Sequence, residues 1–137
     1  MVPPRTMMIV GSVIVTLSSC TAPVREDFTH WPTRPHHDAI RPVMQMLIAV
    51  RDGDIELFKA AYSARLRRDF ENEGWDRVFE RYRSLIRSEL GQYTLSDFVL
   101  SAHVKSDWAT VGIKHQGRTL PSISLAREND AWRIDER

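Results

Sequence analysis

The sequence predicts an α+β domain in which N-terminal helices pack on a curved antiparallel sheet of about four strands. Two changes along the chain predict this class. Apolar residues recur at three- and four-residue spacing as far as residue 90, which is typical of amphipathic helices. After Gly91 the apolar period becomes two, which is typical of half-buried strands. With 137 residues, 42% of them hydrophobic, the chain has enough apolar material for one core but not comfortably for two.

The first nineteen residues have the order of a secretory signal peptide. Arg5 supplies a positive charge, residues 7–17 form a largely apolar run, and Ser18 and Ser19 are small. The run covers eleven residues, too few to span a bilayer core of ~30 Å. We therefore expect residues 1–19 to be removed as a signal peptide.

The end of that segment carries a more specific pattern. Leu17-Ser18-Ser19-Cys20 resembles the lipobox of bacterial lipoproteins. The resemblance implies diacylation of the Cys20 sulfur, cleavage before Cys20, acylation of the new amino group with a chain such as palmitate, and hence membrane attachment. Several acyl chains anchor a protein stably, whereas one anchors it marginally. The alternative is that Cys20 is an incidental small residue of an ordinary signal peptide.

The residue after the cysteine bears on the destination. Thr21 stands where an Asp would resemble an inner-membrane retention signal, so we expect the outer membrane, with the domain facing the periplasm. Residues 20–37 contain three prolines and no apolar period, and we expect them to form a tether. Residues 38–137 then form the domain.

Charge and cysteine content exclude several functions. Removing residues 1–19 leaves 18 basic and 18 acidic residues, so no basic field exists for a nucleic-acid partner. One cysteine allows neither an internal disulfide nor a cysteine metal cluster. His36 and His37 are adjacent, a poor arrangement for a metal. We expect no metal and no cofactor.

Three helices are predicted from residue 38 to Gly91. The first begins near Asp38 or Arg41, because Pro42 fits only the first turn, and ends at Asp52-Gly53. The second follows Asp54 as N-cap, with residues 65–73 as a charged connector. The third covers residues 74–91 and has the most regular apolar stripe, formed by Trp75, Val78, Phe79, Tyr82, Leu85 and Ile86.

The strands follow as a meander. A hairpin centred between Ser106 and Asp107 brings the two apolar faces together in one register, which pairs Val104 with Ala109, Ala102 with Val111, Leu100 with Ile113 and Phe98 with His115. In the third strand Leu120 and Ile123 have opposite parity, with Pro121 between them. We expect an edge position, a bulge or a three-residue loop there. Trp132 and Ile134 complete the core in the last strand.

Three passages carry a family resemblance. Residues 49–58 (AVRDGDIELF), 107–111 (DWATV) and 132–135 (WRID) resemble the nuclear transport factor two-like superfamily, also called cystatin-like or SnoaL-like. The similarity is greatest to its small bacterial lipoprotein members. It implies that a strongly curved sheet wraps a long helix into a cone with a pocket. This fold hosts enzymes, binding proteins and assembly modules, so it does not decide the function.

The inner, apolar face holds the candidate site residues. A pocket for a small apolar ligand would be lined by Phe58, Tyr62, Phe79, Tyr82, Leu100, Val111 and Trp132. The weak catalytic candidate is His115, which lies at the end of the apolar face beside the Gln116-Gly117 turn. We expect its ring to be at least partly exposed, without an acidic partner.

The sequence therefore favours a non-enzymatic envelope lipoprotein that presents a domain for a small ligand or a protein partner. One alternative is a dehydratase or isomerase with His115 as its acid/base group. Another is an assembly module that forms a homodimer through the sheet face around the exposed Trp108. Lys105, Lys114, Arg118 and Arg127 would line that same outer face.

Overall fold

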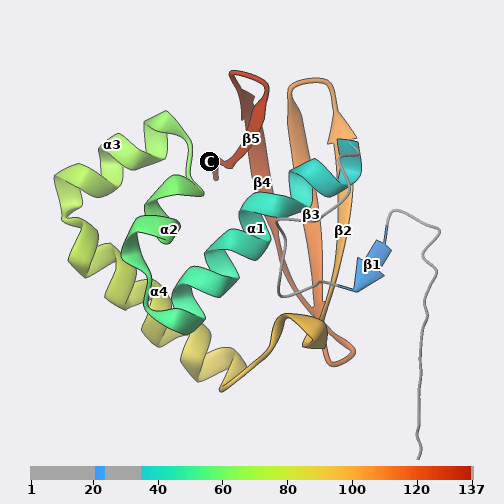
Figure 1. The fold of residues 1–137 in the computed structure, drawn as a ribbon, viewed down its shortest axis with the longest axis horizontal. Helices are drawn as coiled ribbons and strands as arrows, with labels where there is room; N and C mark the ends of the chain where they lie inside the picture. Colours follow the sequence, from blue (N-terminus) through green and yellow to red (C-terminus); the bar gives the residue numbers. More distant parts are fainter. Residues whose placement is uncertain (1–20, 24–34, 137) are drawn as a thin grey trace, which may run out of the picture.

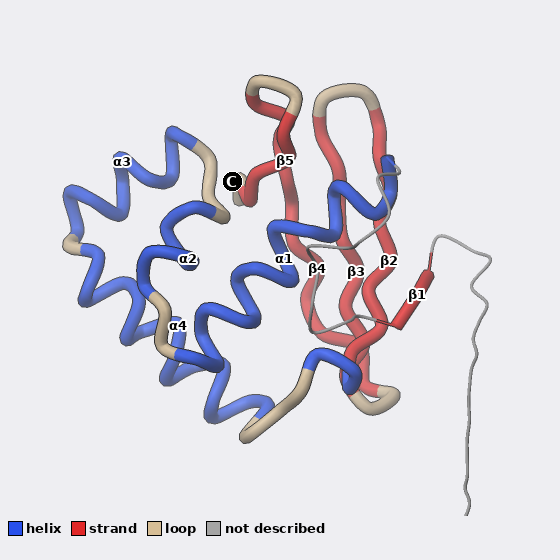
Figure 2. The backbone as a smooth tube through the Cα atoms, viewed as in Figure 1, coloured by secondary structure: helices blue, strands red, loops and turns tan. Residues whose placement is uncertain are grey.

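Helices and strands form two layers in the computed structural model, which describes residues 21–23 and 35–136. The described helices lie on one side of an antiparallel sheet that does not close into a barrel (Figures 1 and 2). The predicted α+β class is therefore confirmed. Residues 1–20, with the predicted signal peptide and Cys20, and residues 24–34 of the predicted tether lie outside the described residues.

The elements follow one another without a crossover. The helices are α1 (Pro35–Asp52), α2 (Ile55–Ala60), α3 (Ala64–Glu73) and α4 (Trp75–Leu90), followed by a short 3-10 helix, η2 (Leu95–Asp97). The strands are β1 (Thr21–Pro23), β2 (Phe98–Lys105), β3 (Trp108–His115), β4 (Arg118–Glu128) and β5 (Ala131–Ile134). They lie in the sheet in this order, each paired antiparallel with the next.

α1 is the central helix and is buried on nearly all sides. It contacts β2, β3 and β5 on the sheet side and α2 and α4 on the other. A helix enclosed in this way needs apolar side chains all round rather than one stripe. The buried residues of α1 are Ala39, Ile40, Pro42, Val43, Met44, Met46, Leu47, Ile48, Ala49 and Val50.

The start of α1 corrects the sequence prediction. The helix begins at Pro35, not near Asp38 or Arg41, and Pro42 lies in its interior. Pro35 takes the first position, where its missing N–H is harmless, and Asp38 lies in the first turn, where a negative charge is favourable. Pro42 lacks a helical hydrogen bond. Its burial against the sheet side of the molecule compensates for that loss.

The first part of the predicted tether belongs to the sheet. Thr21 pairs with Ser101 and Pro23 with Val99, so β1 covers the free edge of β2. At the other edge Tyr62 forms a parallel bridge with Ile134 of β5. β1 is therefore a short edge strand of three residues, and a single bridge covers part of the β5 edge, both of which limit edge-to-edge association.

The predicted charged connector is a helix. Asp54 caps α2 as expected, accepting a hydrogen bond from the Leu57 N–H at 3.1 Å. Ser63 then caps α3 in the same way, accepting from the Leu66 N–H at 3.2 Å. α3 is mostly charged and buries two apolar residues four positions apart, Leu66 and Phe70. That spacing and the serine cap indicate a helix, but the many charged residues of this segment favoured the prediction of a connector.

α4 agrees with its prediction in its bounds, and its predicted apolar stripe is buried in part. It lies between Gly74 and Gly91, whose φ angles of 105° and 65° are in the region that favours glycine. Val78 and Phe79 are buried, whereas Leu85, predicted on the apolar stripe, is 56% exposed. The stripe is therefore covered along its first half, where α2 and α3 pack on it.

The hairpin register is confirmed in each predicted pair. Val104 faces Ala109, Ala102 faces Val111, Leu100 faces Ile113, and Phe98 faces His115. The bulge around Pro121 is also confirmed. Val111 pairs with Ile123 but Ile113 pairs with Leu120, so β4 has one extra residue. The extra residue puts Leu120 and Ile123 on the same face, where both pack against the core.

Candidate functional site

The predicted pocket residues mostly fill the core rather than line a space. Phe58 is fully buried and its ring centroid lies 4.9 Å from those of Tyr62 and Phe79. Leu100 and Val111 are also fully buried on the sheet side. Tilted and edge-to-face rings at this spacing are a packed cluster. None of the pockets described below is lined by all seven residues, so a ligand pocket formed by this set stays a prediction.

Three members of the predicted set reach the edge of the cluster. Tyr62 and Tyr82 border a small pocket of about 150 Å³ together with the β4 bulge and Glu136. Burial raises the pKa of both phenols above the usual value of 10.0, so both stay neutral and serve as hydrogen-bonding groups. Trp132 borders a different pocket of about 210 Å³ beside the start of α1.

His115 corrects a further expectation. It is 7% exposed, not partly open to water, and its ring lies 4.7 Å from that of Phe98. The chain closes over it because η2 returns to the sheet, where the Gln116 N–H donates to the Asp97 carbonyl at 3.3 Å. His115 Nε2 is buried and has no hydrogen-bond partner. Among residues 38–136, no acidic side chain is paired with it to form an acid–base couple.

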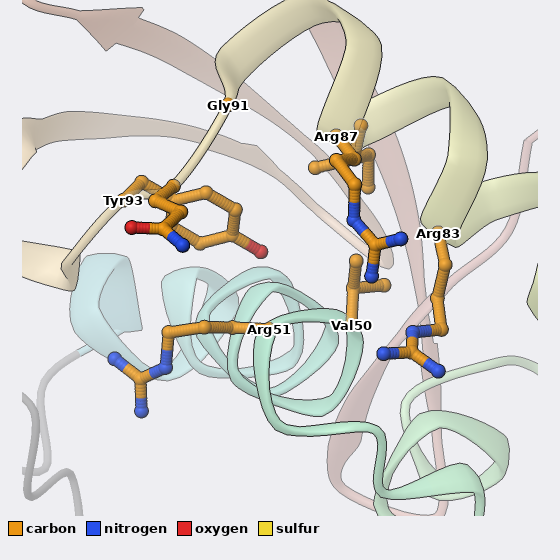
Figure 3. A pocket seen from close by; sticks show the side chains of 8 residues that line it. Val50, Arg51, Arg83, Arg87, Gly91 and Tyr93 are labelled. Atoms are coloured by element: carbon orange, nitrogen blue, oxygen red, sulfur yellow. The ribbon is translucent and has the colours of Figure 1, made fainter.

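A larger pocket lies where the end of α1 meets the second half of α4 (Figure 3). Its volume is about 550 Å³. The α4 side contributes Arg83, Ile86 and Arg87, and the α1 side Val50 and Arg51. Gly91, Gln92 and Tyr93 close it where the chain leaves α4. We call this space the arginine pocket.

The three arginines of this pocket differ in their partners. Arg51 turns outward and donates to Asp52 at 2.8 and 3.2 Å, which lowers the pKa of that carboxyl and balances the arginine charge. Arg83 is 3.4 Å from Glu80, yet its Nε is buried without an acceptor. Arg87 pairs with no carboxylate among the described residues. Its guanidinium lies over Val50, between Tyr93 and Arg83 (Figure 3).

Arg83 and Arg87 are a like-charge pair four residues apart on one helix. Such pairs destabilise an isolated helix by roughly 0.2–0.5 kcal/mol. In α4 both side chains line the arginine pocket, so the positive potentials of the two guanidinium groups add in it. Val50 forms an apolar floor beneath the Arg87 guanidinium (Figure 3), and Ile86 adds a second apolar side chain to the lining.

Tyr93 forms the opposite wall and is fixed in place. Its hydroxyl donates to the Leu47 carbonyl of α1 at 2.6 Å, and its ring lies 5.3 Å from Phe98. Burial raises its pKa to about 12. The phenol therefore stays protonated near neutrality and is no general base.

These groups suit binding of an anion. The lining offers guanidinium donors above an apolar floor, and it contains no histidine, carboxylate, cysteine, serine or threonine. An anion with a short apolar part would meet charge-assisted hydrogen bonds at one end and Val50 and Ile86 at the other. An acid–base or nucleophilic mechanism has no group to carry it in this lining.

Residues 21–23 and 35–136 contain no group of three or more histidine, cysteine or acidic side chains that could hold a metal ion. None of the helices described is long and apolar enough to cross a membrane. Comparison with protein-family models, curated proteins and solved structures found no match.

Sequence reasoning missed this pocket. Arg51 lies at the end of one helix, and Arg83 and Arg87 lie on another about thirty residues later. The one local signal was the like-charge pair on α4. Nothing in the spacing says that its turn of α4 lies against the end of α1.

Proposed function

We propose that the chain is a lipid-anchored binding protein of the bacterial envelope whose arginine pocket takes a small anion with a short apolar part. The observation that carries the proposal is Arg87, a guanidinium without a carboxylate partner among the described residues, placed above an apolar floor. Arg87 is exposed to solvent, so an anionic ligand would replace water at its guanidinium with a charge-assisted hydrogen bond.

The lipobox-like Leu17-Ser18-Ser19-Cys20 supports membrane attachment and the absence of Asp at position 21 supports the outer membrane. The α+β architecture, with helices on one side of an antiparallel sheet, is compatible with a nuclear transport factor two-like domain. That resemblance does not choose between enzyme and binding protein. The pocket chemistry supports binding.

The ligand proposal is tested by calorimetric titration of the full-length protein in lipid vesicles. The probes are hexanoate, the neutral hexanol and inorganic phosphate. We expect hexanoate to bind more tightly than either, because it alone combines a charge with an apolar chain. Arg87→Ala should weaken hexanoate binding by about 10-fold or more, since a hydrogen bond to a charged group contributes roughly 1.5–3 kcal/mol.

The matched control is Arg68→Ala. Arg68 is an exposed arginine of α3, outside the arginine pocket. Equal affinity of hexanoate for both variants would contradict the proposal, as would equal binding of hexanoate and hexanol.

Membrane attachment is tested separately by Cys20→Ala. We expect the variant to remain uncleaved and to carry no acyl chain by mass spectrometry. Processing at the same bond, followed by fractionation with the membrane as for the natural chain, would contradict the lipoprotein proposal.

One observation favours a second candidate function. His115 Nε2 is buried and unpartnered at the end of the apolar face. A dehydratase or isomerase would use such an imidazole as its acid/base group. The substitution of His115 described in the Discussion separates this role from a packing role.

A further inference from the structure

The predicted lipid anchor is next to the sheet rather than at the far end of a tether. Cys20 directly precedes Thr21 in the chain, and consecutive Cα atoms are ~3.8 Å apart across a trans peptide bond. Thr21 is the first residue of β1 and pairs with Ser101 of β2. Residues 24–34 therefore connect β1 to α1 and do not separate Cys20 from the sheet. A protein held by lipid at Cys20 is held by the edge of its own sheet.

The direction of β1 places the anchor toward one end of that sheet. β1 is antiparallel to β2, so the N-terminal end of β1 points toward the hairpin between β2 and β3 (Figure 1). From Ser101 to Lys105 is four residues, roughly 14 Å at ~3.4 Å per residue. Trp108 faces Lys105 at that end. The anchor and this hairpin are close enough to meet one membrane surface.

Among the described residues, no helix lies on the outer face of the sheet, since the helices lie on the opposite side (Figures 1 and 2). On this uncovered face Trp108 is 52% exposed at the hairpin end, and Val99 is 38% exposed at the other end, where it pairs with Lys114. Trp is typical of membrane–water interfaces, where its ring lies at the level of the headgroups.

The charge of this face matches an anionic membrane. Outward positions on β2 and β3 include Lys105 and Lys114 and no acidic residue, although Asp107 lies in the turn between the strands. Lys105 Nζ lies 6.0 Å from the Trp108 ring. Arg118 and Arg127, predicted on this face, are elsewhere: Arg118 donates to the Glu89 carbonyl of α4 at 3.1 Å, and Arg127 lies over Trp132.

We infer that the uncovered sheet face, defined by Val99, Lys105, Trp108 and Lys114, lies against the headgroups of an anionic bilayer. The inference rests on the proposed acylation of Cys20. The partner is the lipid surface in which the anchor is inserted. In this orientation the helices and the arginine pocket point away from the membrane, open to a ligand in the aqueous space.

The test uses the acylated full-length protein in vesicles of phosphatidylethanolamine with phosphatidylglycerol, and in vesicles of phosphatidylcholine. Because Cys20 is the only cysteine and its sulfur is acylated, an introduced cysteine is the only free thiol. His103→Cys places that thiol at an exposed position of the uncovered face, and Arg68→Cys places it on α3 as the control. Each thiol receives an NBD label, which dithionite reduces when water reaches it.

We expect the label at position 103 to be blue-shifted and reduced several-fold more slowly than the label at position 68. The protection should be greater in the anionic vesicles. Lys105→Glu combined with Lys114→Glu should remove most of the difference between the two lipids, since each lysine near an anionic surface contributes about a fivefold change in binding. Trp108→Ala should reduce the protection in both lipids, and Leu85→Ala on α4 should not.

Equal reduction rates at positions 103 and 68 in acylated protein overturn the inference. So does protection that rises with the number of proteins per vesicle, because it would indicate a second copy of the chain on this face. If mass spectrometry shows an unacylated Cys20 in the protein without introduced cysteines, the proposed lipoprotein function fails instead. The two failures are therefore distinguishable.

Discussion

Tyr93 makes the free energy of unfolding depend on pH in the alkaline range. Its hydroxyl donates to the Leu47 carbonyl and its ring is buried. Burial raises its pKa from 10.0 to about 12. In the unfolded chain the phenol ionises near pH 10, whereas the folded protein keeps its proton until about pH 12.

Proton linkage determines whether the free energy of unfolding rises or falls with pH. Between pH 10 and 12 the unfolded state binds fewer protons than the folded state, so the free energy of unfolding falls as the pH rises. A full proton would change it by about 1.4 kcal/mol per pH unit, and because each state is half-titrated at one end of this window the loss is about 2 kcal/mol. The stability that Tyr93 contributes is fully present below pH 10. Tyr62 and Tyr82, with pKa values also raised by burial, act in the same direction.

Tyr93→Phe removes this proton. At pH 7 we expect the variant to be less stable by about 1 kcal/mol, because the hydrogen bond to Leu47 is lost. Its stability should then fall less steeply, so that the two curves meet near pH 11, about one unit above the ordinary phenol pKa. Urea unfolding followed by circular dichroism from pH 7 to about 11.5 measures both curves. Parallel curves over the whole range would refute the reasoning, and Gln92→Ala, an exposed neighbour, is the control.

Three further outcomes are expected. Phe79→Ala should reduce the free energy of unfolding by ~3–5 kcal/mol because Phe79 is buried against the Phe58 ring, with Leu85→Ala as an exposed control on the same helix; an unchanged melting temperature would contradict this packing. His115→Leu should stabilise the protein by about 1 kcal/mol, because the buried unpartnered Nε2 disappears, and it should leave hexanoate binding unchanged. A destabilised variant would mean that the imidazole has a structural partner, and loss of a measured enzymatic turnover would favour the catalytic alternative. Asp135→Ala should destabilise by about 2 kcal/mol in thermal unfolding, because it leaves the buried Ser63 hydroxyl without its 2.8 Å acceptor, whereas an unchanged stability would show that water replaces the carboxylate.

Strand pairing was accessible from sequence because turns and side-chain parity are local properties. Gln116 and Gly117 both have positive φ angles, 50° and 80°, as a tight two-residue turn needs. Once the turn is placed, a slip of one residue would move every apolar side chain to the wrong face. The bulge at Pro121 followed from the same parity.

Helix α3 and the start of α1 were less accessible because packing outweighs local preference there. α3 is stabilised by contacts far along the chain: its Ala64 N–H donates to the Glu128 carboxylate at 3.1 Å, and Arg65 donates to Asp135 at 2.9 Å. These partners come from β4 and from the residue after β5, so no local pattern announces them. Pro42 remains in a helix because its burial compensates for the missing hydrogen bond.

The functional features also include some that local sequence predicts and others that depend on tertiary contacts. Cys20 and the residues before it form a pattern that is contiguous in the chain, so the sequence alone supports a membrane anchor. The inference that an anchor at Cys20 would lie beside the sheet edge depends on the β1–β2 pairing, which joins residues eighty positions apart. His115 was placed on the correct face by parity, but its burial depends on the return of η2.

The sequence by itself therefore determined the fold class, the helix α4, the hairpin register and the order of β2 to β5, because capping residues, glycines and apolar periods act over a few residues. Tertiary structure alone decided that the aromatic residues fill the core and that Arg87 lies over Val50 with no carboxylate of the described residues paired to it. The physical reason is that a pocket is the space left between packed helices. Its position depends on how α1 and α4 meet, and the side chains of every element between them set that geometry.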